Sequence, residues 1–174
     1  DYYFLYNSLV NGNFKYILEL GSGITSIVFA VAAFELKKRG IPPPIIISME
    51  ENKDYHLNVK KLIPNELKEF IHFHQSNRIT MQRNGRLICM YETIPDYSYD
   101  FIFIDGPTLM GKDGRKAING DLINLAEKNK DKTILAVLDQ RIGTYWAYRE
   151  IFPKSSVNYN PIHKLARIRL DKFK

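Results

Sequence analysis

The sequence predicts one α/β domain, a doubly wound and mostly parallel sheet whose C-terminal strand runs antiparallel. Three observations predict this fold class. Short apolar runs that end in acidic residues alternate with amphipathic helical segments, as they do in βαβ units. The first of these runs enters a glycine turn, a common connection between a strand and a helix at a ligand site. The chain closes on two strand-like runs that resemble a terminal hairpin.

The first apolar run covers residues 14–20 and leads into Gly21-Ser22-Gly23. Glycine adopts backbone conformations closed to other residues and lets backbone N–H groups approach a ligand closely, so this turn is a candidate nucleotide cradle. Glu19 offers an acceptor to a cationic or hydroxyl-bearing part of that ligand. A tight turn that binds nothing is the alternative, because strand-to-helix turns also use glycine.

The next segment, residues 24–39, is predicted to be a helix, because its apolar side chains recur at i, i+3, i+4 and i+7. A second apolar run at residues 45–50 follows three prolines and ends in Glu50. Together with the first run, these segments form a predicted βαβ unit. The helix is expected to bury the face that carries Ile24, Ile27, Val28, Val31 and Phe34.

Two later apolar runs, residues 99–105 and 134–139, each end in an aspartate. Because parallel strands present their carboxyl ends at one edge of a sheet, the acidic residues that end these runs are expected to gather there. Asn84-Gly85 lies between two β-rich runs and predicts a tight hairpin turn. Alternating apolar residues within 155–170 predict the terminal hairpin.

A length of 174 residues and a hydrophobic content of 45% fit a single domain with one sizeable core. We expect residues 14–152 to form a cofactor-binding core and residues 153–174 to form the terminal hairpin. Residues 1–13 are expected to form a helix packed on the sheet, or alternatively a cover over the substrate. No apolar stretch approaches the roughly 20 residues that span a bilayer, so a membrane protein is not expected.

The net charge of +6 is concentrated in the C-terminal part of the chain, because residues from Lys112 onward hold 14 of the 25 basic and 7 of the 19 acidic side chains. A solvated basic surface explains this asymmetry, and an anionic partner is the alternative. Nucleic acid stays a secondary option, because no basic stripe carries aromatic residues at stacking intervals. A single cysteine, Cys89, excludes an internal disulfide and fits a cytoplasmic protein.

The glycine turn departs from a dinucleotide fingerprint, which requires a third glycine and a ribose-binding acid about 20 residues further on. Position 26 is serine, and Glu50 lies 29 residues beyond Gly21. Both departures disfavour an NAD-dependent oxidoreductase, which we keep as an alternative together with a non-catalytic binding domain.

Over about residues 14–152, the chain resembles the class I S-adenosylmethionine-dependent methyltransferases, whose fold is Rossmann-like. Residues 19–26 match their first motif, residues 48–50 match the ribose-binding acid, and residues 100–107 match their fourth motif. The resemblance implies methyl transfer, most closely to the oxygen of a small molecule, with RNA as a further acceptor option.

The resemblance also implies roles for individual residues. Gly21 to Gly23 would back the methionine portion of the cofactor, and Glu50 would accept hydrogen bonds from both ribose hydroxyls. Glu51 takes that role if the strand register shifts by one residue. The expected cofactor-binding residues are Glu19, Gly21, Ser22, Gly23, Thr25, Glu50, Glu51, Gln75, Ser76 and Asp105, with Gln75 and Ser76 near the adenine.

Two carboxylates, Asp105 and Asp139, are the catalytic candidates, because methylation of a hydroxyl requires removal of its proton. In the metal-dependent O-methyltransferases, the corresponding strand ends supply ligands to Mg²⁺, which implies a possible site at Asp105, Asp139 and Gln140. The alternative is that Asp105 binds cofactor or caps a turn and that Asp139 pairs with a base. The candidate ligands for an anionic acceptor are Lys112, Arg115 and Arg141, although solvated loop charges are the simpler interpretation.

Overall fold

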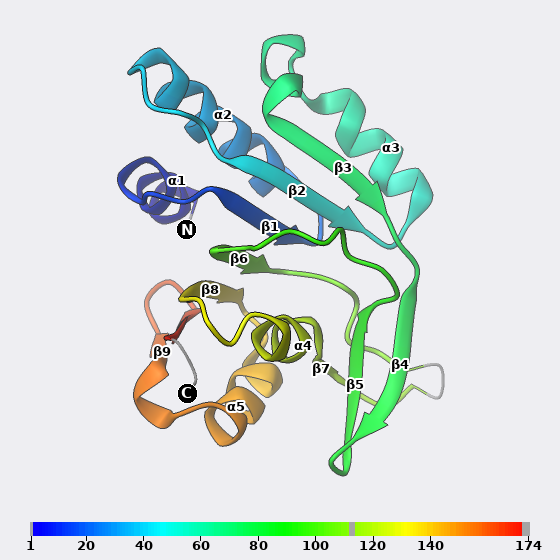
Figure 1. The fold of residues 1–174 in the computed structure, drawn as a ribbon. Helices are drawn as coiled ribbons and strands as arrows, with labels where there is room; N and C mark the ends of the chain where they lie inside the picture. Colours follow the sequence, from blue (N-terminus) through cyan, green and yellow to red (C-terminus); the bar gives the residue numbers. More distant parts are fainter. Residues whose placement is uncertain (1, 112–113, 172–174) are drawn as a thin grey trace.

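The computed structural model of the protein describes residues 2–111 and 114–171. Within these residues, seven strands form the main sheet, in the order β3-β2-β1-β6-β8-β10-β9 (Figure 1). The strands are β1 Tyr16–Leu20, β2 Ile45–Glu50, β3 Ile71–Gln75, β6 Phe101–Ile104, β8 Ile134–Asp139, β9 Val157–Asn160 and β10 Leu165–Leu170.

The main sheet is parallel except at β10. Strand β1 pairs in parallel with β2 and β6, and β6 pairs in parallel with β8. Strand β10 lies between β8 and β9 and runs antiparallel to both. The predicted α/β sheet with an antiparallel C-terminal strand is therefore confirmed, as is the hairpin formed by β9 and β10.

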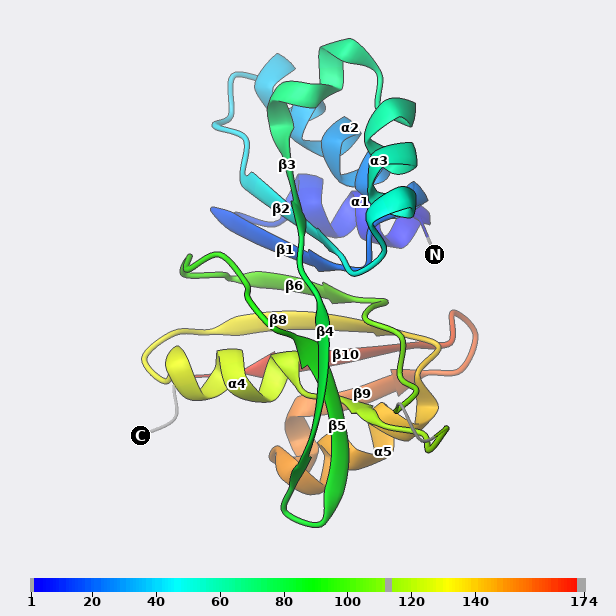
Figure 2. The ribbon, with the colours of Figure 1, turned by 90° about the vertical axis from the view of Figure 1, so that its right-hand side faces the viewer.

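Helices cover both faces of the main sheet, three on one face and two on the other (Figure 2). None of the helices in the described ranges is both long and apolar enough to span a membrane. The first face carries α1 Tyr2–Asn11, α2 Ile24–Lys38 and α3 Lys53–Leu62; the second carries α4 Asp121–Lys128 and α5 Ile142–Ile151; the short 3₁₀ helices are η1 Asn65–Phe70 and η2 Lys154–Ser156.

Helix α2 lies where the sequence predicts it, but the structure corrects its buried face. Ile24 is 62% exposed and Val31 is 38% exposed, whereas Phe29 and Ala33 are buried. Small alanine side chains let the helix lie close to the sheet and to α1. The prediction from spacing counts large apolar side chains. In the structure, the buried face of the helix includes the smaller alanine side chains. Three of the expected residues are only partly buried at the border of this core: Ile27, Val28 and Phe34.

A smaller second sheet lies beside the main sheet and extends away from it (Figures 1 and 2). It consists of β4 Arg78–Arg83, β5 Arg86–Tyr91 and β7 Ile118–Asn119. The predicted turn joins β4 and β5, and both of its residues have positive φ, 49° at Asn84 and 74° at Gly85. The inserted hairpin is therefore confirmed.

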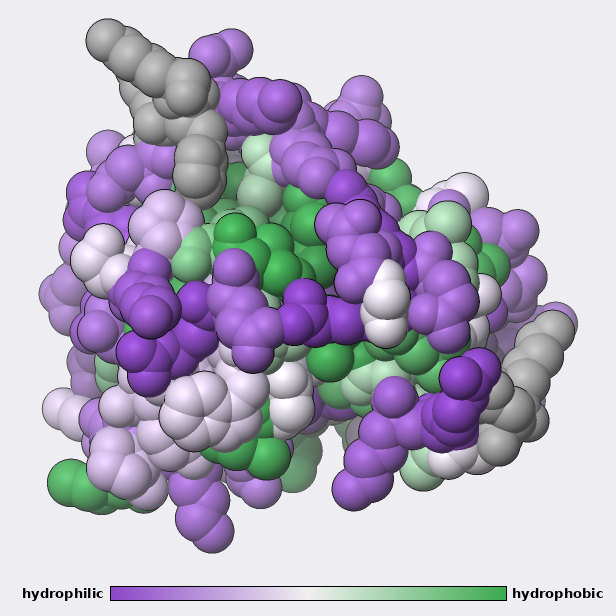
Figure 3. Space-filling model, turned by 90° about the horizontal axis from the view of Figure 1, so that it is seen from below, coloured by the Kyte–Doolittle hydropathy of each residue, from purple (hydrophilic) through white to green (hydrophobic). Residues whose placement is uncertain are grey.

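The hairpin tip is attached to α4 and α5 on the underside of the molecule. Arg83 Nη2 lies 2.5 Å from Glu127 Oε1, and Arg86 pairs with Glu150. Figure 3 shows this underside, where apolar surface at the centre is bordered by hydrophilic residues. A cavity of about 90 Å³ beside the ion pairs has a lining that includes Ile88, Ile118, Ile123 and Ile151.

Candidate functional site

The glycine turn lies at the carboxyl end of β1, in direct contact with the turn after β6. Gly21 has a φ of 95°, and its N–H donates to the carbonyl of Met49 at 3.1 Å. A Cβ at Gly21 would lie 2.8 Å from the carbonyl carbon of Asp105, and one at Gly106 would lie 2.7 Å from Gly21 Cα. Glycine at Gly21 and Gly106 is therefore explained by contact between two backbone segments. By contrast, a Cβ at Gly23 would meet only Tyr55 Oη, at 3.6 Å.

Glu19 is fully buried beneath this turn. Its carboxylate accepts hydrogen bonds from Ser26 Oγ at 2.6 Å, from Ser48 Oγ at 2.5 Å and from the Thr25 hydroxyl. Burial raises the pKa of Glu19 to about 7, although the three hydroxyl donors act in the opposite direction. From the sequence, Glu19 and Thr25 are expected to contact a ligand. In the structure, their hydrogen bonds connect β1 to β2 and to the first turn of α2.

Glu50 ends β2 and faces the glycine turn. Its Oε1 accepts from the backbone N–H groups of Glu51 and Asn52, each at 2.9 Å, and its Oε2 accepts from Ser22 Oγ at 3.1 Å. The side chain is 7% exposed. Three donors thus orient a carboxylate at the carboxyl edge of the sheet, which is the place and the chemistry expected for binding a pair of hydroxyl groups.

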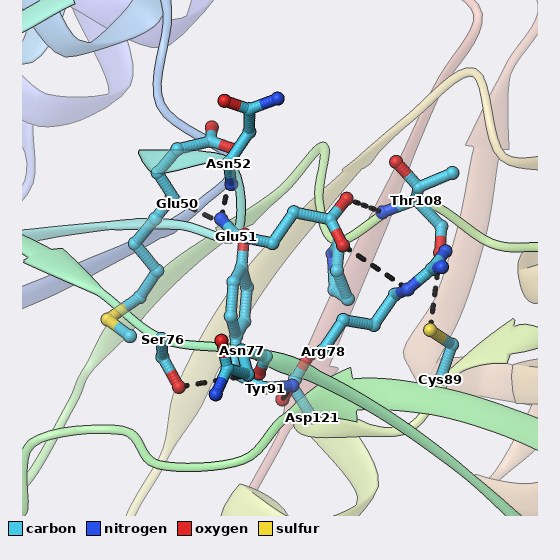
Figure 4. A network of polar contacts seen from close by, with 12 residues as sticks. Glu50, Glu51, Asn52, Ser76, Asn77, Arg78, Cys89, Tyr91, Thr108 and Asp121 are labelled. Carbon is cyan, nitrogen blue, oxygen red and sulfur yellow. Dashed lines mark hydrogen bonds and ion pairs between the residues drawn. The ribbon is translucent and has the colours of Figure 1, made fainter. Parts of the chain in front are cut away.

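The Glu51 side chain points toward Thr108, in the loop after β6, and toward Arg78 (Figure 4). Its Oε1 accepts from the N–H of Thr108 at 2.8 Å, and its Oε2 lies 3.3 Å from Arg78 Nε. The two carboxylates therefore have different neighbours: Glu51 is engaged with the loop after β6, whereas Glu50 accepts from the glycine turn and from the backbone after β2, which is the position expected of a ribose acceptor.

The residues expected near adenine follow β3 and lie beside these two glutamates. Gln75 Nε2 donates to the carbonyl of Glu51 at 3.3 Å, and the N–H of Ser76 donates to the carbonyl of Glu50 at 3.0 Å. The hydroxyl of Ser76 also lies 3.2 Å from Thr93 Oγ1. The structure therefore brings Gln75 and Ser76 to the same end of the sheet as Glu50.

Asp105 directly follows β6, Asp139 ends the neighbouring strand β8, and Arg141 interacts with Asp105. Arg141 Nη2 lies 3.3 Å from Asp105 Oδ1, and Nη1 donates to the carbonyl of Pro107 at 3.2 Å. Burial raises the pKa of Asp105, and the guanidinium lowers it. The sequence suggests Arg141 as a residue that binds an anionic methyl acceptor. In the structure its Nη atoms instead donate to the turn after β6.

Asp139 has a different environment. Its Oδ1 is buried and has no hydrogen-bond partner among the described residues. Burial raises its pKa, and the negative charge of Asp105 raises it further. A buried carboxylate oxygen without a donor is uncommon in a folded protein, so this atom is a candidate for contact with a ligand.

The remaining expectations for this edge find less support. In residues 2–111 and 114–171, no cluster of three His, Cys, Asp or Glu side chains could hold a metal ion. Gln140 has a φ of 46° and continues directly from Asp139. Lys112 lies outside the described residues. Arg115 is exposed, and its carbonyl accepts from the N–H of Gly111 at 2.8 Å.

A buried polar network beneath the turn after β6 was not expected from the sequence. Asn119 Nδ2 donates to the carbonyl of Gly106 at 3.0 Å and to Asp121 Oδ2 at 2.9 Å. Tyr148 Oη donates to Asn119 Oδ1 at 2.9 Å, and the N–H of Tyr91 donates to Asp121 Oδ1 at 3.0 Å. An aspartate at the start of a helix is typical of a helix cap, so no sequence pattern indicates that Asp121 is buried in this network.

No family model matches the chain, and no curated protein matches it in sequence. Among solved structures, the chain is similar to the "Putative Precorrin-6Y C5,15-Methyltransferase Targeted Domain from Corynebacterium diphtheriae". The TM-score is 0.53 at 12% sequence identity, and the match covers 99% of this chain and 95% of that chain. At this identity the likeness concerns the fold. The protein therefore has a Rossmann-like α/β fold, similar to the fold of that methyltransferase domain.

Proposed function

We propose that the protein is an S-adenosylmethionine-dependent methyltransferase that acts on an oxygen atom of a small molecule. The observation that carries this proposal is the position of Glu50. Its carboxylate faces the glycine turn at the carboxyl edge of a methyltransferase-like sheet, held there by Ser22 and two backbone donors. A carboxylate so placed suits the two hydroxyls of a ribose.

The residues around Glu50 fit an adenosyl cofactor. Ser76 and Gln75 lie beside it and offer hydroxyl and amide groups to a nucleobase. Gly23 leaves the space around Tyr55 free of a side chain. When bound, the cofactor supplies a methyl group on a sulfonium, which is already activated for transfer, so the protein's task is alignment and removal of a proton from the acceptor.

In this proposal, Asp139 accepts the proton of the acceptor hydroxyl. Its Oδ1 is buried and without a protein partner in the described part of the chain, and its pKa is raised, both of which suit a general base. Asp105 keeps that pKa high through its negative charge, and Arg141 fixes Asp105 and the turn that follows it. The two carboxylates therefore have separate roles.

A bound Mg²⁺ is not part of the proposal. The guanidinium of Arg141 already pairs with Asp105, and a divalent cation shared by Asp105 and Asp139 would be repelled by its positive charge. Ser26 disfavours the alternative of an NAD-dependent oxidoreductase, because a dinucleotide fingerprint has a third glycine at this position. The Ser26 hydroxyl donates to Glu19 and accepts from the N–H of Gly23 at 3.1 Å, and a glycine could make neither contact.

Calorimetric titration tests the cofactor assignment. The purified protein is titrated with S-adenosylhomocysteine, S-adenosylmethionine and NAD, each with and without Mg²⁺. We expect binding of the two adenosyl ligands alone, unchanged by Mg²⁺. Binding of NAD alone would indicate an oxidoreductase, and binding of none would indicate a non-catalytic interaction domain. A methyl-transfer screen with hydroxylated small molecules, anionic ones included, and with RNA then tests the acceptor.

A further inference from the structure

The turn after β6, residues 105–108, is held by side chains at every carbonyl group. Each of these four carbonyls accepts a hydrogen bond from a side chain on another part of the fold, and we call this segment the strap. Such complete satisfaction by side chains, outside any helix or sheet, indicates a fixed segment. The donors are Arg141 for residues 105 and 107, Asn119 for residue 106, and Arg78 for residue 108.

The strap crosses the carboxyl end of β1. Strand β1 lies between β2 and β6 in the sheet, so any contact between residues that follow β2 and β6 passes over the end of β1. Glu51 follows β2, Thr108 follows β6, and they are joined by a hydrogen bond of 2.8 Å. The near contact of Gly106 with Gly21 places the strap directly on the glycine turn.

Three side chains fix the far end of the strap at Thr108 (Figure 4). Glu51 accepts from its N–H, while Arg78 Nη1 at 2.8 Å and Cys89 Sγ at 3.2 Å donate to its carbonyl. Arg78 Nε also lies 3.3 Å from Glu51 Oε2, so one guanidinium holds both the strap and the glutamate that binds it. About a quarter of the Arg78 side chain is exposed, and screening by solvent is correspondingly limited.

This arrangement is connected through the backbone to the proposed ribose acceptor. The N–H of Glu51 donates to Glu50 Oε1, and so does the N–H of Asn52. A shift of the backbone at Glu51 or Asn52 would therefore change the donors that orient the Glu50 carboxylate. The contacts of the Glu51 side chain with Thr108 and Arg78 help to hold that backbone in place. Loss of Arg78 would remove one partner from Glu51 and one from Thr108 at the same time.

We infer that Arg78 and Glu51 are positioning residues, which hold the strap over the glycine turn and orient Glu50 for the ribose of the ligand. The ligand named in this inference rests on the proposed function. The role of Arg78 and Glu51 in holding the strap does not. Neither residue is expected to contact the reacting atoms. The inference assigns a function to the start of β4, which the sequence identifies only as part of an inserted hairpin.

The test compares Arg78→Ala with Arg83→Ala. Arg83 lies at the other end of the same strand and also pairs with a glutamate, Glu127, but at the hairpin tip. In calorimetric titration with S-adenosylhomocysteine, we expect Arg78→Ala to weaken binding at least tenfold and Arg83→Ala to weaken it less than twofold. Arg78→Lys should recover part of the affinity, because a lysine can still pair with Glu51. Equal affinities of both alanine variants would overturn the inference.

Amide hydrogen exchange tests the structural part without any ligand. The N–H groups of Glu51, Asn52 and Thr108 are the donors at issue, and we expect Arg78→Ala to accelerate their exchange about tenfold while Arg83→Ala leaves them unchanged. If wild type binds no adenosyl ligand but these amides respond, the proposed function fails and the strap stands. Unchanged exchange in Arg78→Ala would overturn the strap even if the cofactor assignment is correct.

Discussion

Replacement of Glu50 gives the sharpest test of the cofactor site. The Glu50→Ala variant removes a carboxylate that accepts from both the glycine turn and the N–H groups after β2. Leaving a buried hydrogen-bonding group without its partner costs about 1–3 kcal/mol. We therefore expect S-adenosylhomocysteine to bind about 1–3 kcal/mol more weakly, which is roughly 5-fold to 150-fold in the dissociation constant.

The same substitution also affects folding. Ser22, Glu51 and Asn52 each lose an acceptor, and at about 1 kcal/mol for each lost hydrogen bond the free energy of unfolding should fall by about 3 kcal/mol. Affinity must therefore be measured at a temperature at which circular dichroism shows the variant folded. Glu50→Gln, which keeps one acceptor oxygen, should lie between wild type and Glu50→Ala in both quantities.

The assay is calorimetric titration with S-adenosylhomocysteine, and Glu66→Gln is the matched control. Glu66 is an exposed glutamate of η1, the short helix that leads into the amino end of β3, whereas Glu50 lies at the carboxyl end of β2. The Glu66→Gln substitution should leave both the affinity for S-adenosylhomocysteine and the free energy of unfolding unchanged. An unaltered dissociation constant in folded Glu50→Ala would refute the reasoning, because the orientation of Glu50 would then have no connection to the ligand.

Three further predictions concern the turns and the buried acids. Gly21→Ala should reduce the free energy of unfolding by about 2–5 kcal/mol in urea denaturation, because it adds a clash with the backbone of Asp105 to the cost of positive φ. Gly40 also has positive φ but has no atom within 4 Å of an added Cβ, so Gly40→Ala should reduce it by only about 1–2 kcal/mol. Equal losses in the two variants would exclude the clash at Gly21. Since burial raises the pKa of Glu19 to about 7, the folded protein binds that proton more tightly than the unfolded chain does, so stability should fall by about 3 kcal/mol as pH rises from 4.5 to 7. Glu19→Gln should make urea-denaturation curves less dependent on pH, and an unchanged dependence would argue against a proton on this residue. Asp139→Asn should leave the affinity for S-adenosylhomocysteine unchanged while lowering methyl transfer to an identified acceptor about 100-fold or more, the scale of general-base catalysis; near-normal turnover would remove Asp139 from the chemistry.

Local sequence patterns predicted the elements of this protein well. The glycine turn, the acids at the ends of β1, β2 and β8, and the Asn84-Gly85 hairpin turn are all where the sequence places them. Each depends on properties that act over a few residues, such as backbone freedom at glycine or the alternation of apolar side chains. The same reasoning failed for the buried face of α2, because the depth of packing there depends on α1 and on the sheet.

The sequence alone could not separate the roles of the charged residues. Glu50 and Glu51 are adjacent and chemically equivalent, yet one faces the glycine turn and the other binds Thr108 and Arg78. Arg141 resembles a ligand for an anionic acceptor, and its donors hold the turn after β6. Direction of a side chain is set by strand register and by partners far away in the chain.

The sequence by itself determined the α/β class, the first βαβ unit, the two hairpins and the edge of the sheet at which the acids are expected, because hydrophobic periodicity and turn chemistry are local. Only the tertiary structure showed that the turn after β6 lies on Gly21. It also showed that residues of β4, β5 and β7 converge on that turn together with the residue after β2 and the residue before α5. Those contacts join positions tens of residues apart, and their energies depend on burial and on distances that exist only once the sheet has formed.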